Sequence, residues 1–533
     1  MKNYWRIGEP CVWGTGAALA VTLLIALTLI VVVMINGLGV FWPGNLHQLE
    51  TSDGGKLLGE LIKQEPIPDQ AGERLQFKVG NRDLYGLDFR WVDEGMIVKR
   101  HLPREAITLE REEYGNFYGF LEQLEPAGMI DTQTFESSFE ALEALHDKVL
   151  EQKHEIAQKS ELVAEISYES EQLRLKQMQR IYAGAGEQSA EYLALEAQRQ
   201  QLERQFHRQL ALQNALEKEM RRAHAVFVDA AGESKEMAVA DLVRFYRPND
   251  MSWLAKAWFY AGKLVELIFG EPRESNTEGG LFPAIFGTVM LIFIMSLFSF
   301  PLGVIAAIYL REYAREGLVV RIVRIAVNNL AGIPSIVYGI FGLGFFVYGI
   351  GSSIDSLFFA ERLPTPTFGT GGILWASLTL SLLTVPVVIV ATEEALGAIP
   401  REMREGSLAL GSTKFQTLYR ILVPMASPGI MTGLILAMAR AAGEVAPLMI
   451  TGVVKLAPAL PIDGNFPFVH LDRKFMHLGF HIFDIGFQSP NVEAAKPMVF
   501  VTTLLLVLIV LVMSSIAIYL RNKMKKRYTF GTF

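Results

Sequence analysis

Residues 498–520 read MVFVTTLLLVLIVLVMSSIAIYL, a run without a single charged side chain. A helix needs about 20 apolar residues to cross the hydrocarbon core of a bilayer, because lipid offers no partners for unpaired backbone groups. Five further stretches meet the same test, at residues 14–41, 281–310, 319–350, 372–390 and 425–452. The chain is therefore predicted to be an all-α polytopic membrane protein with six transmembrane helices.

The composition supports this prediction and limits the alternatives. Hydrophobic residues make up 51% of the 533 residues and the mean hydropathy is +0.27, which is unusual for a soluble protein. The net charge of −7 is mild, so nothing indicates a nucleic-acid partner. The single cysteine, Cys11, excludes an internal disulfide and a cysteine-rich metal site. The first apolar run is longer than a typical signal core and has no convincing cleavage site before Trp42, so we interpret it as an anchor rather than a secretory signal.

Positive charges predict the orientation in the membrane. Both ends are basic and an even number of spans places them on one side, so both termini are expected to be cytoplasmic in a bacterial inner membrane. The predicted parts are an N-terminal tail with the first span (1–44), a periplasmic domain (45–278), a core with five spans (279–520) and a basic cytoplasmic tail (521–533). The flanking basic residues are Lys2, Arg6, Arg311, Arg315, Arg321, Arg324, Arg401, Arg404, Lys414, Arg420, Arg521, Lys523, Lys525, Lys526 and Arg527.

The periplasmic domain is expected to be an α+β insertion. Residues 74–110 alternate apolar and polar side chains in short runs, which is typical of strands. A helical stretch follows in which apolar residues recur at every seventh position, the period of a coiled coil: Phe135, Leu142, Val149, Ile156 and Val163. The sequence AGAG at 183–186 interrupts it, and a second apolar series follows. An antiparallel coiled-coil hairpin is predicted at about 134–222.

The most specific motif lies in the predicted cytoplasmic loop 392–424. Glu405-Gly406-Ser407 precede Gly411 by three residues, and Ile421-Leu422-Val423-Pro424 follow after nine more. This pattern resembles the EAA-x₃-G-x₉-I-x-L-P signature of the permeases of ABC importers, with small or aliphatic replacements at 406, 407 and 423. In that family the loop forms a short coupling helix in a groove of a separate ATPase. The candidate coupling residues are Glu405, Gly406, Ser407, Leu408, Ala409, Leu410, Gly411 and Ser412.

Physical chemistry supports this spacing. Gly411 can adopt the left-handed conformation that ends a short helix, and small residues at 406, 407 and 409 permit close approach to a partner. The chain has no G-x-x-x-x-G-K-[ST] loop, so it is not expected to be an enzyme or to hydrolyse ATP. The resemblance implies a second permease, two copies of an ATPase that carries ATP and Mg²⁺, and a periplasmic binding protein. Membrane lipid is the remaining partner, and no cofactor is expected in this chain.

Two membrane stretches indicate the substrate. Residues 439–448 (ARAAGEVAPL) resemble the R-A-x-G-E-T-A-P-L segment of phosphate importer permeases, with Val445 where threonine is usual. Residues 330–339 (LAGIPSIVYG) resemble their G-x-P-S-I-V-x-G segment. The resemblance implies import of inorganic phosphate. A permease for another oxyanion such as sulfate or molybdate is the closest alternative, and a membrane sensor or scaffold is a weaker one.

Ionisable side chains inside these stretches are candidates for the translocation pathway. Arg440 and Glu444 are four residues apart and share a helix face, so they can pair. We weigh two hypotheses equally: Arg440 gives the anion a transient partner, or the pair only holds helices together. Asn328, Asn329 and Ser335 add donors near a break expected at Gly332 and Pro334. For the glycines of this stretch, and for Gly429 and Gly433, close packing against the second permease is the favoured interpretation.

A metal site is also conceivable in the last periplasmic loop. His477 and His481 stand four residues apart, and Asp484 follows. No other ligand-forming residues cluster there, so a surface histidine pair is the favoured interpretation and no metal is expected.

Overall fold

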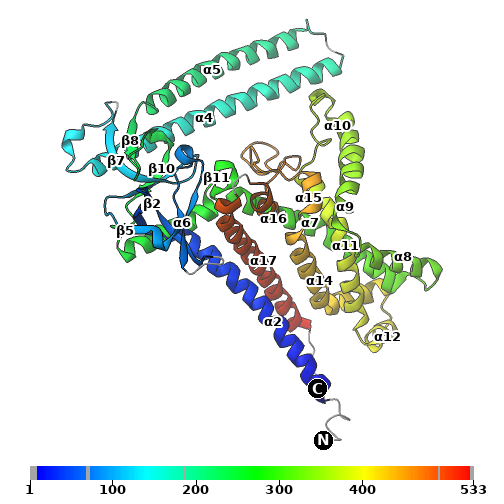
Figure 1. Cartoon of the computed structure of the whole chain (residues 1–533). Coiled ribbons are helices and arrows are strands. Elements are labelled where there is room, and N and C mark those ends of the chain that lie inside the picture. Colours follow the sequence, from blue (N-terminus) through cyan, green and yellow to red (C-terminus); the bar gives the residue numbers. More distant parts are fainter. Residues whose placement is uncertain (1–8, 68–71, 127, 185, 490–491, 529–533) are drawn as a thin grey trace. The chain divides into compact units, whose positions relative to one another are not determined.

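The computed structural model describes residues 9–67, 72–126, 128–184, 186–489 and 492–528. Contacts divide the chain into two compact units. The helical unit contains the chain up to Val40, Glu266–Phe359 and the chain from Thr365 onward. The strand unit contains Phe41–Val265 and Ala360–Pro364. We describe each unit by itself (Figure 1).

The helical unit is built mainly from helices, and the long ones are apolar. The helices are α2 (Glu9–Leu38), α7 (Phe282–Ile308), α8 (Leu318–Leu330), α9 (Ser335–Phe341), α10 (Ser352–Phe358), α11 (Ile373–Gly397), α12 (Arg401–Ala409), α13 (Lys414–Thr417), α14 (Val423–Gly443), α15 (Ala446–Thr451), α16 (Leu478–Phe483) and α17 (Val492–Tyr528). The π-helical segments Tyr309–Tyr313, Gly342–Gly351, Leu418–Leu422 and Asp484–Gln488 adjoin some of them. The strands β11 (Pro272–Arg273) and β12 (Glu278–Gly279) pair as a two-stranded antiparallel ribbon.

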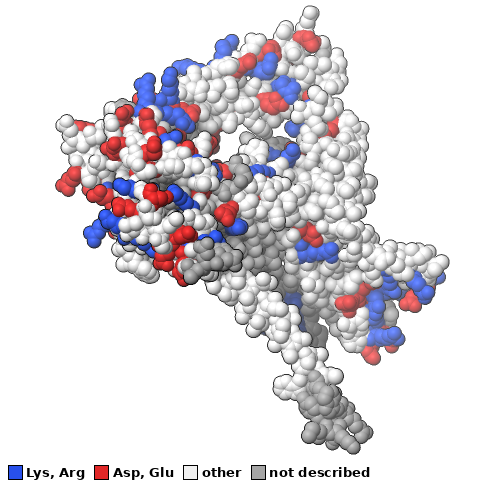
Figure 2. Space-filling view, viewed as in Figure 1, with Lys and Arg blue, Asp and Glu red and all other residues white. Residues whose placement is uncertain are grey.

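Six helical stretches of the described chain are long and apolar enough to cross a membrane, as the sequence predicts. They are Cys11–Phe41, Phe282–Tyr313, Ser335–Phe358, Ile373–Gly397, Lys414–Gly443 and Val492–Lys526. Figure 2 shows the charged side chains gathered over the strand unit and a few loops, with few over the apolar helices. The apolar surface of these helices is the surface that a lipid solvent requires.

The predicted start of the third span is wrong. Residues 319–330 belong to the separate helix α8, and the span begins only at Ser335. Pro334 lacks a backbone donor and disfavours helical conformation in the residue before it, so the helix stops there. α8 carries Arg321 and Arg324 on one side, and Arg324 pairs with Glu393 of α11 at 3.4 Å. This pair holds α8 against the helix bundle.

Two further boundaries differ from the prediction. The fifth span runs from Lys414 to Gly443 rather than from 425 to 452, because the chain becomes extended at Glu444 before the separate helix α15. At the other end of the chain, residues 521–528 continue α17 rather than forming a separate tail. The predicted tail residues 529–533 and the N-terminal Lys2 and Arg6 lie outside the described residues.

The spans pack closely where one helix presents glycine to another. A Cβ added at Gly429 or Gly433 of α14 would lie 2.5 Å or 2.8 Å from the Cβ of Ala395 or Ala391 in α11. A Cβ at Gly303 of α7 would lie 2.7 Å from the Cβ of Val388. Gly429 and Gly433 therefore allow close packing as predicted, but the contacted helix belongs to this chain and not to the second permease.

The strand unit contains two five-stranded antiparallel sheets and a helical pair. The strands are β1 (Leu46–Thr51), β2 (Lys56–Pro66), β3 (Glu73–Lys78), β4 (Phe89–Asp93), β5 (Ile97–His101), β6 (Ile107–Arg111), β7 (Phe117–Glu125), β8 (His224–Val228), β9 (Ser234–Ala238) and β10 (Leu242–Tyr246). The sheet orders are β4-β3-β2-β1-β5 and β10-β6-β7-β8-β9. The helices of this part are α3 (Arg82–Tyr85), α4 (Ser138–Tyr182), α5 (Ala190–Met220) and α6 (Trp253–Phe269), which passes into the helical unit at Glu266.

The pair α4 and α5 is inserted between two paired strands. β7 and β8 are hydrogen-bonded neighbours, with Glu125 opposite His224, and the chain between them forms the two long helices. Ser137 begins α4 with a capping box to Glu140, and the Ser189 side chain caps α5. The two helices run side by side in Figure 1.

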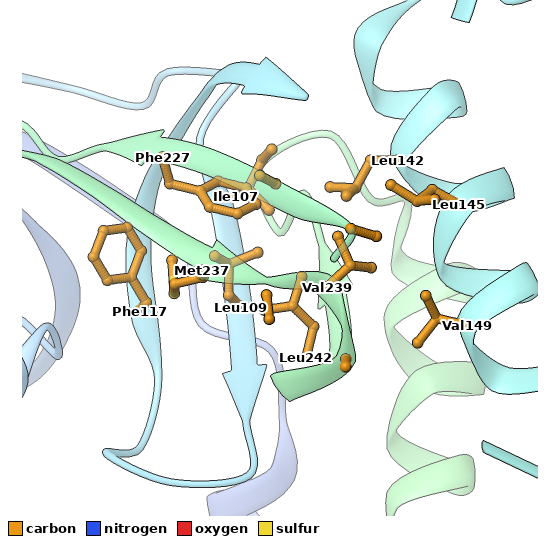
Figure 3. Packing of buried hydrophobic residues seen from close by; sticks show 14 of the residues in the cluster. Ile107, Leu109, Phe117, Leu142, Leu145, Val149, Phe227, Met237, Val239 and Leu242 are labelled. Carbon is orange, nitrogen blue, oxygen red and sulfur yellow. The ribbon is translucent and has the colours of Figure 1, made fainter. Parts of the chain in front are cut away.

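The heptad residues do not all serve the helical pair. Leu142 and Val149 are fully buried, and they pack with Leu145 against the second sheet around Phe227 (Figure 3). Val163, farther along α4, is only half-buried. The start of the heptad series therefore packs on the sheet core, together with Met220 at the end of α5. The coiled coil itself stays a prediction.

Candidate functional site

The loop after the fourth span forms a short helix with a defined end. α12 spans Arg401–Ala409, and Gly411 follows it with φ of +85°. The amide of Gly411 donates to the carbonyl of Leu408 at 3.0 Å, and the amide of Ser412 donates to the carbonyl of Ser407 at 3.2 Å. These two bonds form the Schellman pattern, which needs a residue that tolerates the left-handed conformation. Gly411 therefore has the conformation that the sequence predicts.

Polar contacts hold α12 to its surroundings. Arg404 donates to Glu312 at 2.7 Å and to the carbonyl of Leu396 at 2.8 Å. Ser407, expected at a partner surface, is buried instead, and its hydroxyl lies 2.9 Å from that of Thr417. Ser407 points inward because it lies on the helix face that packs on α13. The other predicted coupling residues from Glu405 to Gly411 are exposed.

An apolar patch lies beside this helix. Leu410 is 89% exposed, although exposure of an apolar side chain to water is unfavourable. Leu408 is also exposed, and the exposed rings of Phe415 and Tyr419 stack with centroids 6.2 Å apart. An exposed cluster of this kind is typical of a surface that another protein covers. We call Leu408, Leu410, Phe415 and Tyr419 the α12 patch.

Arg440 and Glu444 lie where the fifth span ends. Arg440 is in the last turn of α14, and Glu444 follows Gly443 with extended backbone. The Nε of Arg440 lies 3.6 Å from Oε1 of Glu444, which is an ion pair but longer than a hydrogen bond. The two side chains are 33% and 21% exposed. In the described chain no hydrogen bond of the guanidinium is found, so its five N–H donors stay available.

The two membrane motifs come together in space. A Cβ added at Gly339 of α9 would lie 2.8 Å from the Cα of Pro447 in α15, so these helices touch. Tyr338 precedes Gly339 on α9, and its hydroxyl donates to the carbonyl of Leu330 at 2.8 Å. Tyr338 belongs to the motif at residues 330–339 but was not among the predicted site residues.

The predicted polar donors occupy different places. Asn328 and Asn329 are exposed on α8, and Ser335 is half-buried at the start of α9. The chain breaks between them at Ala331–Pro334, as the sequence predicts, and Gly342 packs within this chain because its added Cβ would lie 2.2 Å from Oγ1 of Thr379. The structure places Ser335 and Tyr338 on the helix that touches the Arg440 segment, whereas the two asparagines lie on α8.

The histidine pair is not at the surface. His477 and His481 are almost fully buried, which contradicts the surface interpretation. His481 lies 3.1 Å from the hydroxyl of Thr502 and 2.9 Å from the carbonyl of Asn276, and Asp484 pairs with Lys455 at 2.9 Å. Among the described residues no group of three or more potential ligands is positioned for a metal ion. The histidines are therefore core residues.

These buried histidines make stability depend on pH. Burial lowers the pKa of both His477 and His481 to about 4. The unfolded chain binds these protons near pH 6.5, so stability is complete above pH 6.5 and is lost as the pH falls toward 4, by about 3 kcal/mol for each group. We expect the melting temperature of the purified chain in detergent to fall over this range. His481→Gln should make the fall shallower and exposed His154→Gln should leave it unchanged; equal pH profiles for all three proteins would contradict the assignment.

Comparison with known proteins identifies the family. A family model described as a binding-protein-dependent transport system inner membrane component matches residues 299–526. The probable ABC transporter permease protein YqgI of Bacillus subtilis is 32% identical over 223 residues, which cover 40% of this chain and 70% of that protein. The chain belongs to this permease family. The matched region contains α12, the α12 patch and both membrane motifs.

Within the family the permease is PstA-like. It is 34% identical over 189 residues to the probable phosphate transport system permease protein PstA of Methanocaldococcus jannaschii, covering 35% of this chain and 60% of that protein. The chain is also 34% identical over 194 residues to the probable ABC transporter permease protein YqgH of Bacillus subtilis. This match covers 36% of this chain and 59% of that protein. The chain thus spans about 60% of the length of these two relatives. A permease in an inward-facing structure of the MetNI methionine ABC transporter aligns over 47% of this chain and 96% of that one, at 16% identity and a TM-score of 0.33, a likeness too weak to support further argument.

Proposed function

We propose that this chain is the permease subunit of an ATP-driven ABC importer that moves inorganic phosphate from the periplasm to the cytoplasm. It would form half of the translocation pathway. The observation that carries the proposal is Arg440, a guanidinium at the end of a membrane span whose only ion pair in the described chain is loose. Ionisable groups in a membrane protein are costly and mark ion pathways. The similarity to PstA proteins supports phosphate as the anion.

The chemistry of this site fits a transient anion contact. A guanidinium presents planar donors that match two oxygens of a phosphate group. Glu444, 3.6 Å away, partly neutralises Arg440 and repels an incoming anion, so the anion is held weakly enough to leave. Ser335 and Tyr338 on the touching helix add hydroxyl groups to the same region. The pathway role of Arg440, Glu444 and Ser335 is thus our proposal, with Asn328 and Asn329 at its cytoplasmic approach.

Energy would enter through α12. The α12 patch would supply an apolar surface for a groove of a separate ATPase, beside the exposed residues of α12. Arg404 fixes the helix to the carbonyl of Leu396, so a displacement of α12 would be transmitted to α11. Two copies of a PstB-like ATPase would carry ATP and Mg²⁺, and this chain would need no cofactor. A PstC-like second permease and a periplasmic PstS-like phosphate-binding protein would complete the importer. We place both termini in the cytoplasm and residues 45–278 in the periplasm of the inner membrane.

Uptake in intact cells tests the proposal. In a strain that has no other phosphate importer, removal of this chain should abolish uptake of radiolabelled phosphate at micromolar concentration, because a pathway made of two permeases cannot form from one. Sulfate uptake, measured alongside, should not change, and the intact gene should restore phosphate uptake. Normal phosphate uptake without the chain would refute phosphate as the substrate, and a selective loss of sulfate uptake would replace it.

A further inference from the structure

Helix α6 has all its charged side chains on one face, and that face is bound to the protein. Lys263 pairs with Glu110 of β6 at 2.5 Å. Lys256 donates to the side-chain oxygen of Asn45 at 2.6 Å and to the carbonyl of Pro43 at 3.2 Å.

Glu266, the remaining charged residue of the helix, pairs with Arg273 at 2.5 Å. An aromatic contact adds to this face, since the rings of Phe259 and Tyr246 lie 4.4 Å apart. The inner face of α6 is therefore fixed by ion pairs, hydrogen bonds and ring contacts.

The opposite face of α6 is apolar, and the described residues leave it exposed. Trp258 is 83% exposed, Leu254 74%, Trp253 70%, Phe269 69% and Val265 58%. Leu254, Trp258, Val265 and Phe269 are four or seven residues apart, so they form one stripe along the helix, and Trp253 adjoins its first turn. Single exposed apolar residues are ordinary, but a continuous stripe with two tryptophans marks a surface that something other than water covers. We call these five residues the α6 stripe.

The chain on both sides of α6 indicates what covers the stripe. Trp42 directly follows the first span, which ends at Phe41, and its ring lies 6.4 Å from that of Trp253 and 6.1 Å from that of Tyr260. Only residues 270–281 separate the end of α6 at Phe269 from the start of the second span at Phe282. Tryptophan and tyrosine gather at the membrane–water boundary, where their rings are wet at one end and apolar at the other. The stripe thus contacts the residue that follows the first span, and it ends a short distance along the chain before the second span begins.

We propose that α6 lies in the plane of the membrane surface and inserts the α6 stripe into the leaflet on its side. Such helices bury their apolar face about 5–10 Å deep, at the boundary of headgroups and acyl chains. Through Lys263 and Phe259, the inserted helix would hold the second sheet of the strand unit at the bilayer. The proposal depends only on the spans crossing a membrane and is independent of phosphate transport.

The distribution of charge makes the proposal more specific. Amphipathic helices that select anionic lipids carry lysine and arginine on the face beside the lipid. Both lysines of α6 are engaged with oxygen atoms on the inner face, so α6 itself presents no cation beside the stripe. Insertion should therefore rest on apolar burial alone and should be equal in zwitterionic and anionic bilayers.

Site-specific fluorescence on the full chain tests this. Cys11 is the only cysteine, so a Cys11→Ser background allows single labels at Leu254→Cys and Trp258→Cys, with exposed Leu162→Cys on α4 as the matched control. Each protein, labelled with a polarity-sensitive dye, is placed in nanodiscs of phosphatidylcholine with and without phosphatidylglycerol. At 254 and 258, nitroxide lipids should quench most of the fluorescence and aqueous iodide little of it, and both lipid mixtures should give the same result. At 162 the order should reverse.

Three outcomes would overturn the proposal. Iodide quenching at 254 and 258 as strong as at 162 would show that the stripe faces water. Protection that appears only when another subunit is added would show that a protein covers it. Lipid quenching that requires phosphatidylglycerol would show that charge rather than apolar burial holds the helix. Unchanged melting temperatures of the three labelled proteins establish that the fold is intact in each comparison.

Discussion

Replacing Arg440 by alanine should reduce phosphate uptake about a hundredfold while leaving the chain folded in the membrane. Truncating one member of a charge-assisted contact in a desolvated site costs about 2–5 kcal/mol, and a hundredfold change corresponds to about 2.7 kcal/mol. The cost to stability should be small, because the pair with Glu444 is loose and both side chains are partly exposed. Uptake per molecule of chain, counted in isolated membranes, is the measurement.

Two matched variants separate a pathway role from a role in assembly. Arg440→Lys keeps the charge but loses the planar pair of donors, so it should retain part of the uptake. Glu444→Gln removes the neighbouring negative charge, so the anion should bind more tightly and leave more slowly, which lowers both the half-saturating phosphate concentration and the maximal rate. If Arg440→Ala transports phosphate normally at normal chain abundance, the pair only holds helices together.

The six spans were predictable because lipid imposes one strong demand, a long apolar helix. The start of the third span was predicted wrongly because the length and apolar composition of the stretch outweighed its helical pattern of polar residues. Residues 319–330 are apolar enough to be counted with the third span, yet Arg321, Arg324 and Asn328 recur every three or four residues, which is the polar stripe of an amphipathic helix. That spacing, together with Pro334, indicates a separate helix before the span and places the start of the third span after Pro334.

Other features depend on contacts between distant residues and leave no local trace. β8 completes the second sheet by pairing with β7, but about one hundred residues of helical pair separate them, so the short run His224–Val228 carries no sign of its partner. The contact of Gly339 with Pro447 likewise joins two segments far apart in the chain. In contrast, the apolar neighbours Phe475, Met476 and Phe480 were an available signal that His477 and His481 are buried.

Replacing Lys263 by methionine is expected to destabilise the strand unit by about 3–5 kcal/mol, because it leaves a buried carboxylate without its cation. Lys263 and Glu110 are 12% and 9% exposed and lie 2.5 Å apart. A second buried acid, Glu60, aggravates the loss: burial raises its pKa, and the negative charge of Glu110 raises it further. Thermal unfolding followed by tryptophan fluorescence reports on this unit, since it contains Trp42, Trp91, Trp253 and Trp258 of the seven tryptophans.

A double substitution distinguishes an uncompensated charge from lost packing. Lys263→Met combined with Glu110→Leu removes both charges and keeps apolar volume, so most of the lost stability should return. Arg174→Ala, which breaks the exposed pair of Arg174 with Glu171, is the control and should change stability by less than about 1 kcal/mol. If the double variant is as unstable as Lys263→Met alone, the methylene chain of Lys263 rather than its charge holds α6 on the sheet. Packing would then hold the inner face of α6 on the sheet, and the ion pair would add no net stability.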